Sequence, residues 1–467
     1  MVGNRLSENL FRLTSALTTW SPKAGARFLD AVLSHTVGSR PVANHFFRRN
    51  LAIVRGVAHF DRILVIADIH IGDAVMLQGA ITAFRDFFPT ARIDYIIKQS
   101  AACLIEGNSD ISNLYPIFTG TVYPDPSDPL KVSQISRDNR YDLCLDCSPF
   151  LEDRRVFAKG QSVLNFLTVA PQLVRNEFGR TGINHFSYQS REFVHTLLST
   201  IRRPVRTEVF AGVPVTISDR ANEEAEAFLR DSGIQKDRAI IFLNPDAASM
   251  YTRIPFEYQV AILTGLTQFD AQILLGAGFT ERQIEQRLLS ALPPAQRARI
   301  ACVPKSLSLD AYAALCDFMD VFVSADTGPL HIAAARKVSR SGNHRFRNRT
   351  FVISLFGATP AHMSGYDSSD PLYPAANQDA PSRTYVSGSP CRNLTCVNKI
   401  AKTCKVARCF ETLDVAQIVA DIKSYLPRLD HRRPESCSTA LVAPRQESAE
   451  SIVSPGGASV VSNLRAS

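Results

Sequence analysis

Short apolar runs alternate with segments of helical spacing from residue 62 onward. Residues 62–68, RILVIAD, have the length and composition of a buried strand. After a short turn, apolar residues recur at helical intervals until Pro89, which ends the predicted helix. The pattern then predicts a strand at 92–98, a short helix at 100–107, and strands at 114–118 and 141–147.

A second series of the same kind begins at residue 239. It predicts strands at 239–246, 271–277, 321–326 and 350–357, and helices at 257–266, 281–292, 312–320 and 413–426. Alternating strands and helices of this length form parallel sheets with helices on both faces. We therefore expect an α/β protein with two doubly wound, Rossmann-like sheets in series. Its natural ligand site is the cleft at the carboxyl ends of their strands.

Changes in composition mark the limits of these two series. Leucines at helical spacing among Arg and Lys precede the first strand, and a polar, Arg-rich segment with Pro204 and Pro214 separates the two series. From His431 onward, Ser, Pro, Ala and charged residues replace the apolar periodicity. We predict an amphipathic helical extension (1–58), a first Rossmann-like domain (59–203), a linker (204–218), a second Rossmann-like domain (219–428) and a disordered tail (429–467).

Length and composition agree with this organisation. The chain's 467 residues are enough for two or three domains, and 45% hydrophobic and 21% charged residues are typical of globular proteins. No run of 18 apolar residues occurs, and the beginning of the chain does not read as an export signal. We therefore expect a cytoplasmic protein whose ten cysteines are mostly reduced thiols.

The net charge favours anionic partners. The chain has 52 Lys and Arg against 44 Asp and Glu, a formal charge of +8. Nucleotide sugars and phospholipid surfaces both fit such a balance. Because the basic residues are scattered and do not alternate with aromatic ones, we do not expect nucleic acid as a partner.

The turn after the first strand is the first candidate for chemistry. Gly72 allows a tight turn, and Asp73 lies at the start of the helix. There it either caps backbone N–H groups or projects into the cleft as a base. The turn lacks the G-x-G-x-x-G pattern, which gives little support to a dinucleotide dehydrogenase.

The turn SADTGPLHIAAA, residues 324–335, is the second candidate and again leads from a strand to a helix. Asp326, Thr327 and Gly328 leave backbone donors free at a helix N-terminus, where the helix dipole favours a phosphate. His331 falls within the first helical turn. It either donates to a phosphate or sugar hydroxyl, or is a partly buried histidine with partners inside the protein.

The two turns together resemble those of glycosyltransferase family 9, which contains the ADP-heptose:lipopolysaccharide heptosyltransferases. The resemblance spans roughly residues 60–425 and rests on the RILVIADIHIGDAVMLQGA segment and on SLSLDAYAALCDFMDVFVSADTGPLHIAAA. It implies the GT-B architecture, in which two Rossmann-like domains face each other across a cleft. The two strand and helix series derived above agree with that architecture.

The resemblance also implies roles for individual residues. The catalytic aspartate of the family falls at Asp73, which would take the proton from the acceptor hydroxyl in an inverting transfer. Asp326 would orient the hydroxyls of the donor sugar, while Thr327, Gly328 and His331 would contact the diphosphate. The family needs no metal, and we expect no cofactor.

Three positions depart from the family pattern. Where the family has a Lys-x-Trp-Pro segment, residues 252–255 read TRIP, so Arg253 either replaces the lysine or is a surface residue. Glu281 is the nearest carboxylate to the family's ribose contact, or an ordinary acidic residue at a helix start. Residues 68–70, Asp-Ile-His, stand where serines are usual.

We also assign Asn244, at the end of the 239–246 strand, to the donor site.

Two later segments have no assigned catalytic role. Four cysteines fall within 19 residues, and four thiols can bind zinc, although zinc sites usually have tighter Cys-x2-Cys spacing. We favour a structural loop, with a disulfide or a zinc site as alternatives, for Cys391, Cys396, Cys404 and Cys409. The basic segment 337–349 either contacts an anionic acceptor or is solvated.

The sequence therefore favours an inverting, metal-independent glycosyltransferase. It would move a heptose or related sugar from a nucleotide-diphosphate donor to a lipopolysaccharide core or similar glycolipid. Peripheral contact with the cytoplasmic face of the inner membrane is compatible with the basic charge and the amphipathic N-terminal segment. Two alternatives stay open: a nucleotide-sugar epimerase of the same architecture, and an inactive sugar-nucleotide-binding module.

Overall fold

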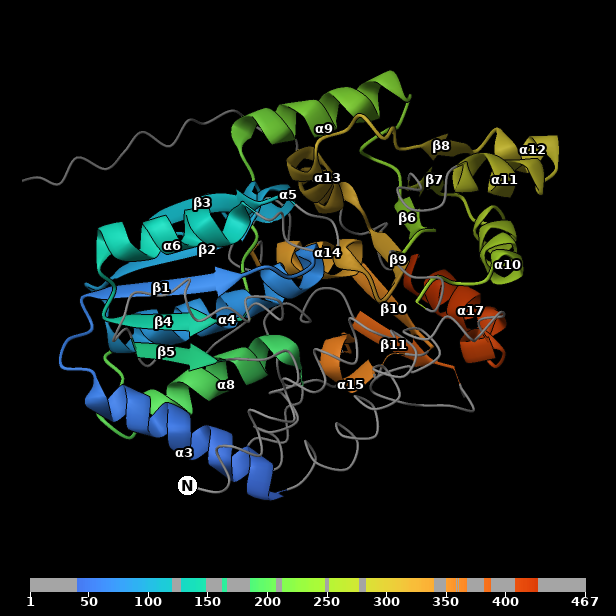
Figure 1. The fold of residues 1–467 in the computed structure, drawn as a ribbon. Helices are drawn as coiled ribbons and strands as arrows, with labels where there is room; N and C mark the ends of the chain where they lie inside the picture. Colours follow the sequence, from blue (N-terminus) through green and yellow to red (C-terminus); the bar gives the residue numbers. More distant parts are fainter. Residues whose placement is uncertain are drawn as a thin grey trace, which may run out of the picture. The chain divides into compact units, whose positions relative to one another are not determined.

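A computed structural model describes most of the chain between residues 40 and 426 (Figure 1). The described residues are 40–119, 127–147, 162–165, 185–206, 212–247, 252–276, 283–339, 350–357, 359, 361–367, 382–387 and 408–426. Among them, no helix has the length and apolar character needed to span a membrane.

The first sheet contains five parallel strands in the order β3-β2-β1-β4-β5. Four of them match predicted strands, and the central strand β1 is buried at every residue except its first. The order reverses between β1 and β4, which is the topological switch point of a doubly wound sheet. The bounds are β1 Arg62–Ala67, β2 Arg92–Lys98, β3 Asn113–Phe118, β4 Leu143–Asp146 and β5 Ser162–Asn165.

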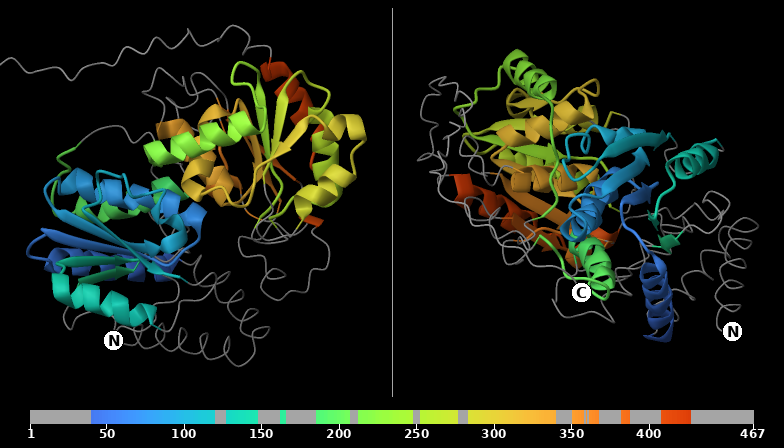
Figure 2. Two further views of the ribbon diagram at one scale, coloured as in Figure 1. Left: turned by 90° about the horizontal axis from the view of Figure 1, so that it is seen from above. Right: turned by 90° about the vertical axis from the view of Figure 1, so that its left-hand side faces the viewer.

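Helices cover both faces of this sheet (Figure 2). Ile63 and Val65 of β1 belong to the hydrophobic core shared with α4 (Ile71–Phe87) and α8 (Phe186–Leu198). Leu64 and Ile66 instead share a smaller core with α6 (Asp128–Asn139). This alternation explains why β1 reads as a continuous apolar run: a strand buried on both faces has no polar side. The short helix α5 (Gln99–Ala102) follows β2.

The second sheet contains six parallel strands in the order β11-β10-β9-β6-β7-β8. Counted along the chain, this is the 3-2-1-4-5-6 order of a Rossmann sheet, with its switch point between β6 and β9. The prediction of two doubly wound sheets is therefore confirmed. The bounds are β6 Ile240–Asn244, β7 Gln272–Leu275, β8 Ile300–Cys302, β9 Val321–Ala325, β10 Phe351–Phe356 and β11 Ser382–Val386.

Helices also cover both faces of the second sheet. Phe242 and Phe322 stack with their ring centroids 5.0 Å apart in the core that includes α13 (Leu309–Leu315) and α14 (Gly328–Ser339). Ile241 and Leu243 pack in a second core with α10 (Phe256–Leu266) and α17 (Val415–Tyr425). The remaining elements are α9 (Asp219–Asp231), α11 (Ile284–Ser290), α12 (Pro294–Arg297), α15 (Ala361–Ser364) and the 3-10 turns η3 (Cys316–Phe318) and η4 (Arg408–Phe410).

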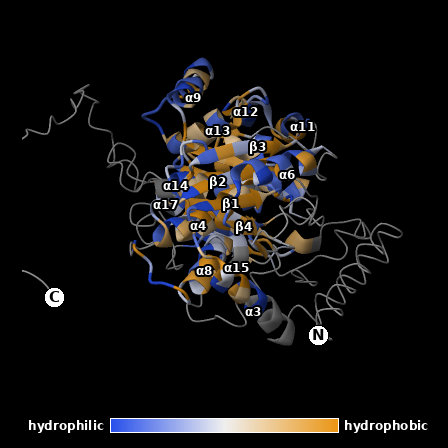
Figure 3. Cartoon of the chain, turned by 60° about the vertical axis from the view of Figure 1, so that its left-hand side comes forward, coloured by the Kyte–Doolittle hydropathy of each residue, from blue (hydrophilic) through white to orange (hydrophobic). Residues whose placement is uncertain are grey.

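Several elements were not predicted. They include α6, α8, α9 and the strands β5, β8 and β11, so the predicted last strand, β10, is followed by one more. The strands β5, β8 and β11 lie at sheet edges and have three to five residues each. The helix α9 has only three buried residues, and it is largely hydrophilic in Figure 3, where the central strands β1 and β2 are hydrophobic. Strands of three to five residues show little alternation of apolar and polar residues, which explains why these three strands were missed.

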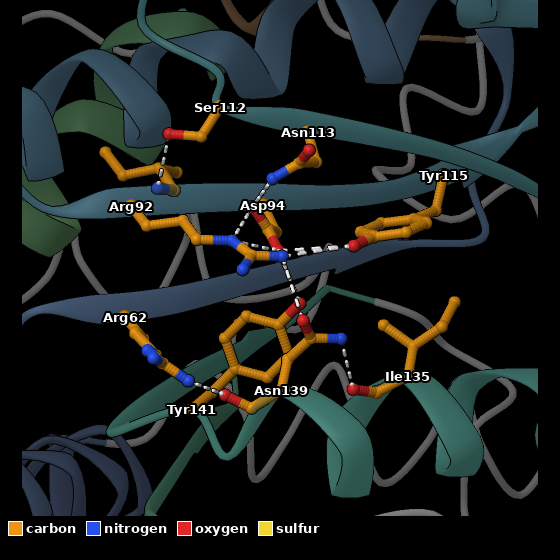
Figure 4. Close-up of polar contacts among 10 residues, drawn as sticks. Arg62, Arg92, Asp94, Ser112, Asn113, Tyr115, Ile135, Asn139 and Tyr141 are labelled. Atoms are coloured by element: carbon orange, nitrogen blue, oxygen red, sulfur yellow. Dashed lines mark hydrogen bonds and ion pairs between the residues drawn. The ribbon is translucent and has the colours of Figure 1, made fainter.

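A buried carboxylate ties the strands of the first sheet together near their amino ends (Figure 4). Asp94 of β2 is fully buried and accepts hydrogen bonds from Arg92 (2.7 Å), Asn113 (2.8 Å) and the Tyr141 hydroxyl (2.6 Å). Burial and the hydrogen bond to Asp94 raise the pKa of Tyr141, so its hydroxyl keeps the proton that it donates. This network lies at the amino ends of the strands, whereas ligands of such sheets bind at the carboxyl ends, so its role is structural.

The segment predicted as a linker packs against both sets of helices. Val213 and Val215 are buried, and the Gln78 side chain of α4 donates to the Pro214 carbonyl (2.8 Å). Arg336 of α14 donates to the Val215 carbonyl. The predicted domain limits stay a prediction, although each sheet falls within one predicted domain.

The N-terminal extension is described only in part. The helix α3 (Arg40–Gly56) contacts β5 and α8 of the first sheet's layer. This packing role is an alternative to membrane contact for the described part of the extension. The rest of the extension and the tail from residue 429 lie outside the described residues.

Candidate active site

The two strand-to-helix turns begin helices that touch at their N-termini. A Cβ atom placed on Gly328 would lie 3.5 Å from the Ile71 Cβ, and one placed on Gly72 would lie 2.4 Å from the His331 Cδ2. The second distance is far below normal contact, so only glycine fits at position 72. We call residues 71–73 and 326–331 the helix junction.

Asp73 is the third residue of α4 rather than its N-cap. The N-cap is His70, whose side chain is exposed and makes no capping hydrogen bond. Asp73 is partly exposed. The helix dipole stabilises the charged form of a carboxylate in the first turn of a helix. Such a carboxylate can act as a base toward a hydroxyl that becomes acidic as it reacts.

Asp326 follows β9 directly and is held by protein donors. Its carboxylate is 16% exposed and lies 3.5 Å from the His331 Nε2, and Thr359 and Ser364 also donate hydrogen bonds to it. Burial alone would raise the pKa of Asp326, but these donors outweigh it and lower the pKa below its ordinary value. The carboxylate is therefore ionised at neutral pH.

His331 is buried and has partners at both ring nitrogens. Its Nδ1 lies 2.9 Å from the Tyr366 hydroxyl, and its Nε2 lies near Asp326. This matches the alternative that the sequence left open, a buried histidine with partners inside the protein. The geometry gives no support to a direct phosphate contact by this side chain.

The switch point of the second sheet has a polar pair of its own. The Asn244 side chain is buried and donates to the Ser324 hydroxyl (3.0 Å) and to the Asp246 carbonyl (2.9 Å), linking the ends of β6 and β9. Arg253 is partly exposed, with its Nε 2.9 Å from the Asp246 carboxylate. Arg253 is therefore paired with an acid that lies just beyond the end of β6, and its role in the donor site stays a prediction.

The backbone of Thr327 and Gly328 begins α14. Both residues are partly exposed, and the Thr327 carbonyl accepts from the Leu330 N–H (3.0 Å). Because α14 has 12 residues, its first N–H groups carry the partial positive charge of a full helix. With α4 starting beside it, the helix junction combines two such N-termini, which is an arrangement that favours an anion.

Sequence reasoning missed three polar residues close to these turns. Lys98, the last residue of β2, lies 3.2 Å from Asp68, which follows β1, and both side chains are buried. Both residues are charged and stand at the ends of predicted strands, so the sequence could have indicated this pair. Tyr366 gave no such signal because it lies in a short segment, and His185 gave none because it caps α8, a helix that was not predicted.

Several predicted residues lie outside the described part of the chain: Glu281, Cys391, Cys396, Cys404 and the 340–349 part of the basic segment. Cys409 is described and is buried in η4. Within the described ranges, no group of three or more His, Cys, Asp or Glu side chains is placed to hold a metal ion.

Comparison with known proteins finds a family match in the second half of the chain. Residues 212–402 match the model of glycosyltransferase family 9 (heptosyltransferase). The matched segment contains all the predicted donor-site residues, from Asn244 to His331, whereas Asp73 lies outside it. No curated protein matches the chain in sequence.

Solved structures match over most of the chain. The glycosyl transferase family 9 protein from Veillonella parvula is 14% identical, with 79% of this chain and 98% of that chain covered and a TM-score of 0.57. The ADP-heptose LPS heptosyltransferase II of E. coli is also 14% identical, with 79% and 99% covered and a TM-score of 0.51. These likenesses show a shared fold, which includes the first sheet as well as the matched segment 212–402. The predicted GT-B architecture is confirmed.

Proposed function

We propose that the protein is an inverting glycosyltransferase that moves a heptose or related sugar from a nucleotide-diphosphate sugar to a lipopolysaccharide core or similar glycolipid. The observation that carries the proposal is the helix junction. It brings a carboxylate, Asp73, into the first turn of one helix beside the N-terminus of a second helix, in a chain whose residues 212–402 match family 9. Transfer of a sugar from a diphosphate needs these two functions, a base and an anion site.

The reaction is a single displacement. The acceptor hydroxyl attacks the anomeric carbon, the new C–O bond forms as the bond to the diphosphate oxygen breaks, and the configuration inverts. Asp73 takes the proton of the hydroxyl as general base. The N–H groups that begin α14 at Thr327 and Gly328 stabilise the charge that develops on the leaving diphosphate.

The remaining residues of the donor site serve the sugar and the nucleotide. The ionised Asp326 suits hydroxyl donors of the sugar and would repel a phosphate, so its place is beside the sugar ring. Arg253 adds a cation at the ends of the strands, in the role that lysine has in the family pattern, and Asp246 holds it there. Asn244 and Glu281 complete the proposed set, and no step in this mechanism requires a metal.

The proposed setting is the cytoplasmic face of the inner membrane, where a glycolipid acceptor would be reached without a spanning helix. The net charge of +8 favours an anionic leaflet.

Transfer of a radiolabelled sugar tests the proposal. ADP-heptose, UDP-sugars and GDP-sugars are incubated with the protein and extracted glycolipid, with and without EDTA, and the label in the lipid phase is counted. We expect labelled lipid together with an equal amount of free nucleoside diphosphate, unchanged by EDTA. An isomerised donor without lipid label would indicate the epimerase instead. Donor binding, seen as a raised melting temperature, without any reaction would indicate an inactive binding module.

A further inference from the structure

Tyr366 connects the helix junction to the first sheet's helices. It is buried and follows α15, and its hydroxyl lies 2.9 Å from the His331 Nδ1. Its backbone is held on both sides: its N–H donates to the Ser354 hydroxyl (3.4 Å), and its carbonyl accepts from the Thr384 hydroxyl (2.6 Å). The backbone of Tyr366 is therefore anchored to β10 and β11, independently of His331.

The partners of His331 determine where its proton lies. An ionised carboxylate can only accept, so the Nε2 that faces Asp326 must carry a hydrogen. The Nδ1 of a neutral imidazole then has a free lone pair and accepts, which makes the Tyr366 hydroxyl the donor. The chain of hydrogen bonds thus runs in one direction, from Tyr366 through His331 to Asp326.

A second histidine supports the tyrosine ring from the other sheet's layer. The His185 ring, at the N-cap of α8, has its centroid 4.9 Å from that of Tyr366, and its Nδ1 lies 2.9 Å from the Ser187 hydroxyl. Burial, and then the nearby His331, lower the pKa of His185 to about 3. His185 is therefore neutral at physiological pH and adds no charge to the hydrogen-bond chain.

We propose that Tyr366 is a positioning residue: by donating to Nδ1 it holds the ring of His331 in place, in the Nε2–H tautomer that Asp326 selects. In this form the imidazole holds the Asp326 carboxylate at the end of β9 while its ring packs against Gly72 at the start of α4. Tyr366 thereby fixes the acidic group that meets the donor sugar relative to the helix that carries Asp73. The part of the proposal that concerns turnover rests on the proposed function, whereas the tautomer does not.

The tautomer is measured by NMR of the imidazole nitrogens in protein labelled with ¹⁵N-histidine. The chain has ten histidines, and the spectrum of His331→Gln identifies the signals of His331 by their loss. We expect a single Nε2–H tautomer in both the parent protein and Tyr366→Phe, with the Nδ1 signal shifted downfield in Tyr366→Phe because Nδ1 loses its hydrogen-bond donor. Tyr312→Phe is the matched control, because it removes another buried hydroxyl from the same sheet's layer, one with no hydrogen-bond partner among the described residues. It should leave the His331 signals unchanged.

Kinetics test the positioning role when the parent protein transfers sugar. Losing one neutral hydrogen bond should lower kcat/KM about fivefold in Tyr366→Phe. The Kd for ADP should stay the same, because ADP lacks the sugar that Asp326 holds. Tyr312→Phe should match the parent in both measurements.

Two results would overturn the proposal. One is an Nδ1–H or doubly protonated His331 in the parent, or an Nδ1 signal at the same position in Tyr366→Phe as in the parent. The other is an active parent with the same kcat/KM in Tyr366→Phe. A parent protein that transfers no sugar would contradict the proposed function, and the nitrogen signals of His331 would then decide this proposal alone.

Discussion

At Gly72 the helix junction has no room for a side chain. The His331 ring that occupies the space is held at both nitrogens, by Tyr366 and Asp326, and cannot move aside without breaking those contacts. Gly72 is therefore needed at this position for its lack of a Cβ atom and not for its flexibility. This requirement explains how a residue without functional groups can matter to the chemistry of Asp73 next to it.

We expect Gly72→Ala to weaken ADP binding about tenfold, equivalent to about 1.4 kcal/mol, because the methyl group forces the two helix starts apart. Calorimetry with ADP measures this. Gly56→Ala is the control, since a Cβ atom there would meet nothing within 4 Å. Equal ADP affinity in both variants would show that the spacing of the helix starts is irrelevant to the anion site.

At the level of residues, the sequence predicted those that follow a strand and begin a helix. Asp73 and Asp326 could be located because the strand, turn and helix pattern specifies where such positions lie. Tyr366 and His185 could not, because the contacts of Tyr366 with His331 and with His185 depend on how the elements pack. His331 and Tyr366 are 35 residues apart in the chain, in segments with no common pattern.

At the level of elements, α4 and α8 pack unusually closely. A Cβ atom on Gly79 of α4 would lie 2.1 Å from the Ser187 carbonyl oxygen at the start of α8. Since that oxygen belongs to the backbone, it cannot rotate away. We expect Gly79→Ala to lower the free energy of unfolding by about 1–3 kcal/mol, whereas Gly56→Ala should change it by less than about 0.5 kcal/mol. Urea denaturation gives both values, and a Gly79→Ala protein as stable as the parent would disprove the close packing.

The N-cap of α8 predicts a dependence of stability on pH. The pKa of His185 is about 3 in the folded protein and about 6.5 in the unfolded chain, so between these values only the unfolded chain binds the proton. The free energy of unfolding contributed by this site therefore falls as the pH falls below about 6.5, by about 1.4 kcal/mol per pH unit.

His185→Asn isolates this contribution, because asparagine is a good N-cap and does not titrate. From pH 7 to pH 5 the parent should lose about 2 kcal/mol more than the variant in urea denaturation. Parallel losses in the two proteins would mean that His185 is protonated in the folded state. Other titrating groups, such as His195, cancel in the comparison.

The strands show which elements the pattern of apolar residues can predict. The strands β1, β2 and β6 lie within one or two residues of their predicted limits, because strands buried on both faces are mostly apolar. The edge strand β11, SRTYV, has an exposed Arg and Val and gives no such run. Its assignment depends on pairing with β10, which is a long-range contact that the sequence does not display.

At the level of the whole molecule, the net charge of +8 bears on membrane contact. Attraction to an anionic leaflet falls off within about 8 Å at physiological salt. We expect the full chain to sediment with vesicles that contain phosphatidylserine at low salt and to be largely released at high salt. Vesicles of phosphatidylcholine alone are the control. Equal sedimentation with both kinds of vesicle, or none at low salt, would contradict an electrostatic attachment.

The proposed mechanism depends on Asp73 as the base beside a diphosphate site. The most direct measurement compares sugar transfer to glycolipid by the parent and by Asp73→Asn, with the donor's Kd measured for both. An amide keeps the size and the hydrogen bonds of the first helical turn but cannot take the proton, so we predict a loss of turnover of about 100-fold or more at a nearly unchanged Kd. Transfer by Asp73→Asn at the parental rate would contradict the role of Asp73 as the general base.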